Sequence, residues 1–222
     1  MLLAAMAAVA LAQQGTVGGE MPSPTKTPAK APRTLFFDSN GFEVSNNEFV
    51  DIRMANFHLP DRTLIKTRED GTIEFRLQKI PQEGGPMSAA AALAIDGSAA
   101  GFEAWKGKVI VLNFWFIGCP ACMAEIPRLN QMRSKFEGRD DIVFAAVTAD
   151  TKGKVNDFLK KNVFNYLMIA DGQKYLDSFG FSGYPKNIVV GRDGKIVYWR
   201  STVKAWDKFE SVIRTEAERP LQ

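Results

Sequence analysis

A pair of cysteines directly after a continuous apolar run constrains this chain more than any other feature. Residues 109–116 read Val-Ile-Val-Leu-Asn-Phe-Trp-Phe, and Cys119-Pro-Ala-Cys122 follows shortly after. A continuous apolar run bounded by turn signals is typical of a central strand that is covered on both faces. The next segment has helical spacing, with these residues on one face: Cys122, Ile126, Leu129, Met132 and Phe136. The pattern predicts a dithiol at a strand-to-helix junction.

This placement favours redox chemistry. The unpaired N–H groups and the partial positive charge at a helix N-terminus stabilise a thiolate, so we expect the pKa of Cys119 to be lowered. A thiolate of this kind attacks disulfides, and Cys122 is close enough to resolve the mixed disulfide that forms. Pro120 suits the first helical turn, because its ring fixes φ and its missing N–H costs nothing there. We therefore expect a redox-active pair.

A structural cross-link and a zinc site are the alternatives. A disulfide that closes so short a loop restricts the unfolded chain least, so it stabilises least. Zinc needs four ligands, whereas the chain offers its only two cysteines and one histidine, His58. We expect His58 to be a surface or packing residue rather than a ligand, and no metal site is predicted.

The N-terminal segment indicates export. Residues 1–12 are uncharged and apolar, with the length of a signal peptide and fewer than the roughly 20 residues that a spanning helix needs. If the true N-terminus lies further upstream, the segment could instead be an uncleaved anchor that tethers the protein to a membrane. Residues 13–33 are rich in proline and lysine and predict a disordered linker, since they cannot bury a core.

The composition argues against a nucleic-acid partner. The chain carries 28 basic and 25 acidic residues, a net charge of +3, and no basic run is interleaved with aromatic residues. With 45% hydrophobic residues it can form one domain with an appended subdomain.

Residues 34–84 form a region of their own. A short strand is predicted over 34–38, a helix over about 46–55 after the capping pattern that begins at Ser45, and a strand over 72–77. We attach no chemistry to this region.

From residue 84 onward, strands and helices alternate, as in a layered α/β domain. Predicted strands cover 109–116, 142–147 and 164–170, and an antiparallel hairpin joins 188–190 to 195–198. Predicted helices follow the cysteines and cover 152–161 and about 203–217.

Three motifs occur in this order: Lys106-Gly-Lys-Val-Ile-Val-Leu-Asn-Phe-Trp115, Cys119-Pro-Ala-Cys-Met-Ala-Glu-Ile-Pro127 and Gly183-Tyr-Pro185. On these motifs, residues 85–222 resemble the TlpA/ResA-like thiol-disulfide oxidoreductases of the thioredoxin superfamily. The resemblance implies a thioredoxin-like three-layer sandwich, in which helices flank a central mixed β-sheet. It also implies that 85–97 is the entry hairpin of the family and that 34–84 is a small N-terminal extension.

The same resemblance implies roles for individual residues. Cys119 would be the attacking cysteine and Cys122 the resolving one. Pro185 would form the cis-proline loop that faces the dithiol, and the backbone of Tyr184 would pair with an incoming peptide. The alternative for Pro185 is an ordinary trans proline in a turn before a strand.

Four further residues are candidates for proton handling or for tuning the reduction potential. In this branch the glutamate at the position of Glu125 is implicated in proton handling, and general acid/base help for the dithiol is chemically reasonable. The alternative is an exposed acid favoured by the helix dipole alone. Asn113 stands in place of the thioredoxin aspartate and cannot titrate, so a catalytic carboxylate would have to be Glu125. The intervening dipeptide, Pro120-Ala121, affects the reduction potential and leaves the direction of electron flow open.

The resulting hypothesis is an exported, periplasmic oxidoreductase that reduces protein disulfides and needs no cofactor. By resemblance, its clients would be apocytochrome c haem-site cysteines or metal-centre assembly proteins, and a membrane thiol donor would recycle it. Two other functions are considered. A peroxiredoxin-type peroxidase would need a Pro-x-x-x-Thr-x-x-Cys motif, which residues 112–119 lack. A copper-binding module of this fold typically adds a histidine after the cysteines, and none follows Cys122.

Overall fold

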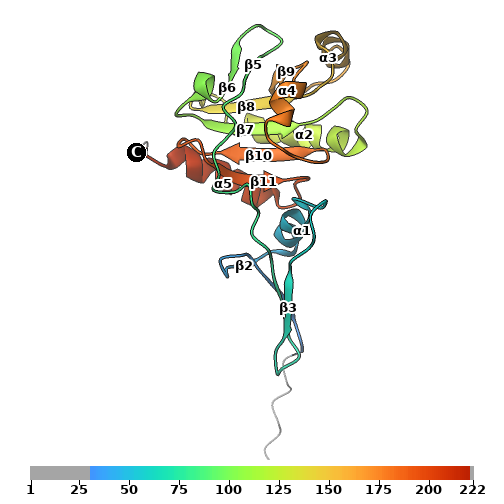
Figure 1. The fold of residues 1–222 in the computed structure, drawn as a ribbon, viewed down its shortest axis with the longest axis vertical. Coiled ribbons are helices and arrows are strands. Elements are labelled where there is room, and N and C mark those ends of the chain that lie inside the picture. Colours follow the sequence, from blue (N-terminus) through green and yellow to red (C-terminus); the bar gives the residue numbers. More distant parts are fainter. Residues whose placement is uncertain (1–30, 221–222) are drawn as a thin grey trace, which may run out of the picture. The chain divides into compact units, whose positions relative to one another are not determined.

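A five-stranded mixed sheet lies at the centre of the computed structural model, which describes residues 31–220 (Figure 1). Its strand order is β11-β10-β7-β8-β9. The first three strands in the sequence run parallel, and β10 is antiparallel to both β7 and β11. The strands are β7 (Val109–Phe114), β8 (Ile142–Val147), β9 (Leu167–Ile169), β10 (Lys186–Val190) and β11 (Ile196–Arg200). The apolar run before the cysteines is thus the central strand, and every residue of β7 is buried.

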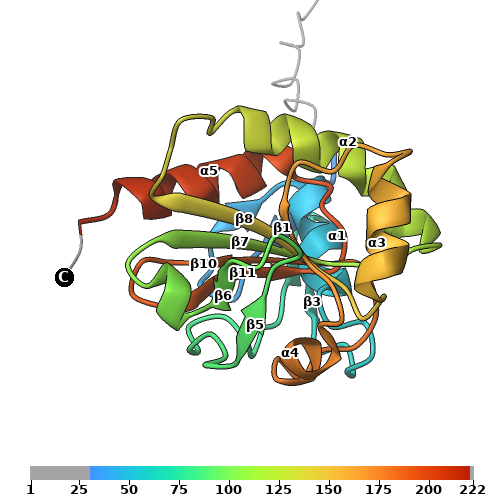
Figure 2. The ribbon, with the colours of Figure 1, turned by 90° about the horizontal axis from the view of Figure 1, so that it is seen from above.

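Helices cover both faces of this sheet, which gives three layers (Figure 2). The two faces of β7 belong to different parts of the core, because successive side chains point to opposite sides of a strand. Val111 packs in a cluster with α2 (Pro120–Ser134), α3 (Lys152–Leu159) and α5 (Trp206–Glu218). Leu112 packs in the opposite cluster with α1 (Asn46–Met54) and α4 (Gln173–Asp177). The predicted thioredoxin-like sandwich is confirmed.

The N-terminal extension has a small sheet of its own, with strand order β2-β1-β4-β3. These strands are β1 (Thr34–Phe37), β2 (Glu43–Val44), β3 (Leu64–Thr67) and β4 (Ile73–Arg76). Phe36 stacks on Phe49 of α1 with ring centroids 4.1 Å apart, and Phe75 packs against both rings. Helix α1 begins at the predicted cap, where the Ser45 hydroxyl accepts a hydrogen bond from the Glu48 amide. This aromatic cluster joins the helix to the small sheet.

Several short elements differ from the prediction. The entry hairpin pairs β5 (Ala91–Leu93) with β6 (Ala99–Gly101), so it begins and ends later than 85–97. A short 3-10 helix (Glu103–Trp105) then leads to β7. Strand β9 has only three residues within the predicted 164–170, and β2, β3 and α4 were not predicted. Each of these elements is too short to show a clear hydrophobic period.

The predicted signal peptide, residues 1–12, lies outside the described residues. The same holds for the predicted linker over 13–33 apart from its last three positions.

Candidate functional site

The two cysteines open helix α2 and form a disulfide with an S–S distance of 2.07 Å. Cys119 is the N-cap residue, and its sulfur accepts a hydrogen bond from the Cys122 amide at 3.2 Å. Pro120 occupies the start of the helix, where a missing N–H removes no hydrogen bond within the helix. Pro120 and Ala121 are exposed, whereas both cysteines are buried. The first sulfur therefore receives the amide hydrogen bond that stabilises a thiolate at a helix N-terminus.

Asp150, which follows the end of β8, holds the loop that leads into the dithiol. The Ile117 amide donates to Asp150 Oδ2 at 2.7 Å, and the hydroxyl of Thr148 donates to the same oxygen at 3.0 Å. Gly118 then reverses the chain with φ at +90°, a conformation that favours glycine. Sequence reasoning missed Asp150, although an acid just past the carboxyl end of β8 was visible at the edge of the sheet where the dithiol lies.

The Tyr184–Pro185 peptide bond is cis, so the alternative of a trans turn proline is wrong. The loop lies beside the end of β7, the strand that precedes the cysteines, because the next residue, Lys186, pairs with Phe114. The Tyr184 ring also meets the half-exposed ring of Phe116 edge to face, with centroids 5.2 Å apart. These contacts bring together two segments that lie far apart in the sequence.

Glu125 lies in the interior, with only 7% of its surface exposed, so the alternative of an exposed acid is wrong. Its Oε1 accepts a hydrogen bond from the Val203 amide at 2.7 Å, and its Oε2 accepts one from Asn187 Nδ2 at 3.0 Å. Burial raises the pKa of Glu125 to about 7, and the negative charge of Asp51 acts in the same direction. The two hydrogen bonds favour the ionised form and offset part of this shift. Glu125 can therefore change its protonation state near neutral pH.

Asn113 joins the same network through an amide pair. It faces Asn187 across β7 and β10, and Asn113 Nδ2 donates to Asn187 Oδ1 at 2.9 Å. Because Asn187 in turn donates to Glu125, Asn113 is linked to the glutamate through one side chain. No hydrogen bond between Glu125 and either cysteine is found among the described residues. Asn187 was not identified from the sequence, since only the register of β10 against β7 reveals it.

The N-terminal extension also reaches this network. Asp51 of α1 is buried and accepts hydrogen bonds from the Lys204 and Ala205 amides, all at 2.8 Å. Lys186, which follows the cis-proline, is fully buried, and its Nζ donates to Ala55 O at 2.8 Å. Burial lowers the pKa of Lys186 to about 8. Neither residue carries a sequence signal for this position.

Within residues 31–220, no cluster of three or more histidine, cysteine, aspartate or glutamate side chains has a geometry suited to a metal ion. His58 is exposed next to the Phe57 ring, in agreement with the surface position expected for it.

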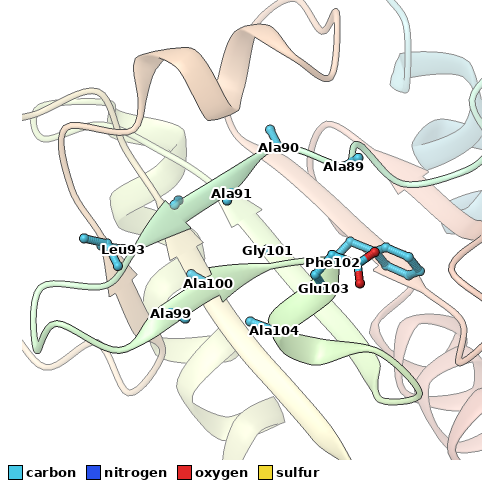
Figure 3. Close-up of a pocket in the computed structure, with 11 residues that line it drawn as sticks. Ala89, Ala90, Ala91, Leu93, Ala99, Ala100, Gly101, Phe102, Glu103 and Ala104 are labelled. Atoms are coloured by element: carbon cyan, nitrogen blue, oxygen red, sulfur yellow. The ribbon is translucent and has the colours of Figure 1, made fainter.

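A pocket of about 480 Å³ lies on the β5–β6 hairpin, between alanine-rich strands and the segment from Phe102 to Ala104 (Figure 3). Its lining contains no residue of the dithiol segment or of the cis-proline loop. We assign it no part in the chemistry of the cysteines.

The fold and the placement of the cysteine pair define a class: thioredoxin-superfamily proteins with a dithiol in the first turn of the helix after the central strand. A family model described as Redoxin matches residues 82–213, more than half of the chain, so the chain belongs to the Redoxin family.

Curated relatives are similar over the same region. The thiol-disulfide oxidoreductase ResA of Bacillus thuringiensis (strain Al Hakam) is 27% identical over 104 residues, which are 46% of this chain and 60% of the relative. ResA of Halalkalibacterium halodurans is 23% identical over 127 residues, 55% of this chain and 72% of the relative. The alignment thus spans three fifths of the length of the Bacillus relative.

Solved structures agree on the fold. A thiol:disulfide interchange protein of the thioredoxin family from Chlorobium tepidum TLS superposes with a TM-score of 0.52 at 18% identity, over 63% of this chain and 99% of that one. The thioredoxin domain of a thiol-disulfide oxidoreductase from Bacteroides vulgatus gives a TM-score of 0.53 at 22% identity, over 59% of this chain and 97% of that one.

Residues 31–220 contain no helix with the length and apolarity needed to cross a membrane.

Proposed function

We propose that this chain is a thiol-disulfide oxidoreductase that exchanges the Cys119/Cys122 dithiol and disulfide with protein substrates. The observation that carries the proposal is the position of the pair: both sulfurs lie in the first turn of α2, with Cys119 as the N-cap. The similarity to ResA supports it, since that protein is named for this activity. The electrons reside on the two sulfurs, so the exchange needs no cofactor.

The exchange proceeds in two displacements at sulfur. The Cys119 thiolate attacks one sulfur of a substrate disulfide, forming a mixed disulfide and releasing the other substrate sulfur as a thiolate. Cys122, deprotonated, then attacks Cys119 Sγ, which closes the internal disulfide and releases the second substrate thiolate. The two protons lost by the dithiol end on the two substrate thiols, so the substrate gains two electrons and the protein loses two.

Glu125 is proposed to handle the proton of Cys122. A carboxyl group with a pKa of about 7 can accept and return a proton at neutral pH. Asn113 and Asn187 hold one side of this carboxyl in place through the amide pair. The contact from Glu125 to a thiol would form in the dithiol state, directly or through water.

Substrate recognition is proposed at the cis-proline loop. The Tyr184 backbone beside Pro185 would pair with an extended segment of the substrate, as a strand edge binds a peptide. Pro120 and Ala121, both exposed at the helix start, would tune the reduction potential and border the same substrate.

We further propose that the protein works outside the cytoplasm as a reductant. The uncharged apolar start of the sequence supports export. Candidate clients are haem-site cysteines of apocytochromes c or metal-centre assembly proteins. Because disulfides persist in such compartments, a membrane thiol donor would have to return the pair to its dithiol form. Residues 1–12 would be a signal peptide or a membrane tether.

Trapping of mixed disulfides tests the roles of the two cysteines. In Cys122→Ser the attack by Cys119 still occurs but cannot be resolved, so we expect client proteins to accumulate in covalent complexes that dithiothreitol releases. Non-reducing gels and mass spectrometry of the linked cysteines would identify them. Cys119→Ser is the matched control and should trap nothing; equal trapping by both variants would contradict the assignment.

A further inference from the structure

Two carboxylates from different parts of the chain hold one short backbone turn. Glu125 of α2 accepts a hydrogen bond from the Val203 amide at 2.7 Å. Asp51 of α1 accepts from the next two amides: Lys204 N lies 2.8 Å from both of its oxygens, and Ala205 N lies 2.8 Å from Oδ2. Three successive N–H groups at the entrance to α5 are therefore divided between a residue of the candidate site and a residue of the N-terminal extension.

A second attachment joins the end of α1 to the strand that holds Asn187. Lys186 Nζ donates to Ala55 O at 2.8 Å and to Ser201 Oγ at 3.0 Å, and Ser201 Oγ donates to Met54 O at 2.9 Å. An ammonium at the C-terminus of a helix pairs with its unsatisfied carbonyl groups and favourably opposes the helix dipole. The backbone oxygen of Ser201 also accepts from Asn187 at 3.2 Å. The two groups that donate hydrogen bonds to Glu125 are the Val203 amide and the Asn187 side chain. Each lies next to a residue that bonds to α1 or to the residue after it, Lys204 in one case and Lys186 in the other.

The charges around Glu125 come from several elements. Asp51 is the negative neighbour and favours the protonated form, whereas Lys204 favours the ionised form. Tyr166, just before β9, and Tyr198 of β11 are buried, and burial together with the charge of Glu125 raises the pKa of each hydroxyl. Besides Lys204, the positive charge of Arg200 also acts on Asp51. Burial raises the pKa of Asp51 above its usual range, and the hydrogen bonds from the Ala205 and Lys204 amides oppose this shift by favouring the ionised form.

We propose that helix α1 completes the candidate site, with Asp51 as a positioning residue that fixes the 203–205 turn against Glu125 and places a second carboxylate beside it. The inference deepens the proposed function, on which its consequence for catalysis rests. A purely structural Asp51 would cap α5 and leave the titration of Glu125 unchanged, so the two roles are separable by experiment.

The test follows the Glu125 side-chain carboxyl carbon by NMR through a pH titration of the disulfide form, in which the cysteines do not titrate. In Asp51→Asn we expect the midpoint to fall by about half a pH unit or more, roughly a threefold change in the proton dissociation constant. Asp51→Glu, which returns the charge, should restore much of the shift. Asp38→Asn is the matched control: it removes another carboxylate of the extension that accepts two backbone amides, outside the network of Glu125.

An unchanged Glu125 midpoint in Asp51→Asn would overturn the proposal. The wild-type protein gives a second test that does not depend on how a variant folds: the Asp51 carboxyl carbon should show an additional shift over the pH range in which Glu125 ionises. Its absence would equally overturn the proposal. Neither readout requires activity, so a wild-type protein that fails to reduce disulfides would contradict the proposed function and leave this result standing.

Discussion

At the scale of single residues, burial determines the chemistry of Glu125. Removal from water disfavours the ionised carboxyl and outweighs the two hydrogen bonds that favour it. The same side chain on a surface helix would be ionised at all pH values where thiols react. The groups that pack around Glu125 therefore bring its pKa close to neutral.

The surroundings of Gly183 leave no room for a side chain. Its φ is +76°, and a Cβ atom there would lie 2.5 Å from Cζ of Phe57. The positive φ alone costs an L-residue roughly 1–2 kcal/mol, and the ring must also move. We therefore expect Gly183→Ala to lower the free energy of unfolding by about 2 kcal/mol or more, measured in urea.

Gly180 provides the control for this substitution. It has a φ of +56° and no atom within 4 Å of an added Cβ, so Gly180→Ala carries only the backbone cost. When Phe57 is also replaced by alanine, the loss in free energy of unfolding that Gly183→Ala causes relative to Phe57→Ala alone should fall to the loss seen for Gly180→Ala. Equal losses for the two single substitutions would show that the contact with Phe57 does not matter.

Residue types and spacing predicted the redox-active cysteine pair, and the family resemblance carried by short motifs predicted the cis-proline. They did not predict the partners of Glu125. Asn187 and Val203 lie 62 and 78 residues further along the chain, and only the assembled sheet brings them to α2. Asn113 was singled out as a residue that cannot titrate, but its partner depends on the register of two strands.

At the scale of elements, continuous apolar runs made the central strands predictable. Strand β8 begins and ends where the sequence predicted, at 142 and 147, since both of its faces are covered. Helix α1 was also predicted, because the cap at Ser45 is local. The function of α1 in the fold was not predictable: Asp51 contacts residues more than 150 positions away.

The extension as a whole is tied to β10, β11 and the start of α5, and not only to its own small sheet (Figure 1). Trp199 of β11 donates from its indole nitrogen to Asn56 Oδ1 at 3.2 Å, just beyond α1. The contacts of Asp51 and Lys186 flank this one. These contacts therefore attach α1 and the residues just after it to β10 and β11, the two strands that follow the cis-proline loop.

At the scale of the whole molecule, Glu125 links stability to pH. Its pKa in the folded state, about 7, lies above the ordinary value of 4.5 for an exposed glutamate. The unfolded chain therefore releases this proton first as pH rises, and the wild-type protein loses stability between those two values. Glu125→Gln has no such proton. From about pH 4 to about pH 8, its free energy of unfolding relative to wild type should rise by up to about 3 kcal/mol.

Chemical denaturation of the disulfide form at a series of pH values measures this difference. Asp141→Asn is the contrasting control, because a hydrogen bond from Arg139 lowers the pKa of Asp141 to about 2. The stability that Asp141 contributes is complete above about pH 4 and is lost as the pH falls toward about 2. The free energy of unfolding of Asp141→Asn relative to wild type should therefore stay constant from about pH 4 to about pH 8 and rise only on further acidification, in the opposite sense to Glu125→Gln. A difference for Glu125→Gln that is constant with pH would contradict the buried, neutral-range carboxyl.

The reduction potential of the Cys119/Cys122 pair tests the central claim most directly. The purified protein would be equilibrated with glutathione buffers, and the dithiol fraction would be counted by alkylation and mass spectrometry. A reductant is expected to have a potential near that of thioredoxin, about −270 mV. A value near that of DsbA, about −120 mV, would contradict the reducing role and identify an oxidant instead.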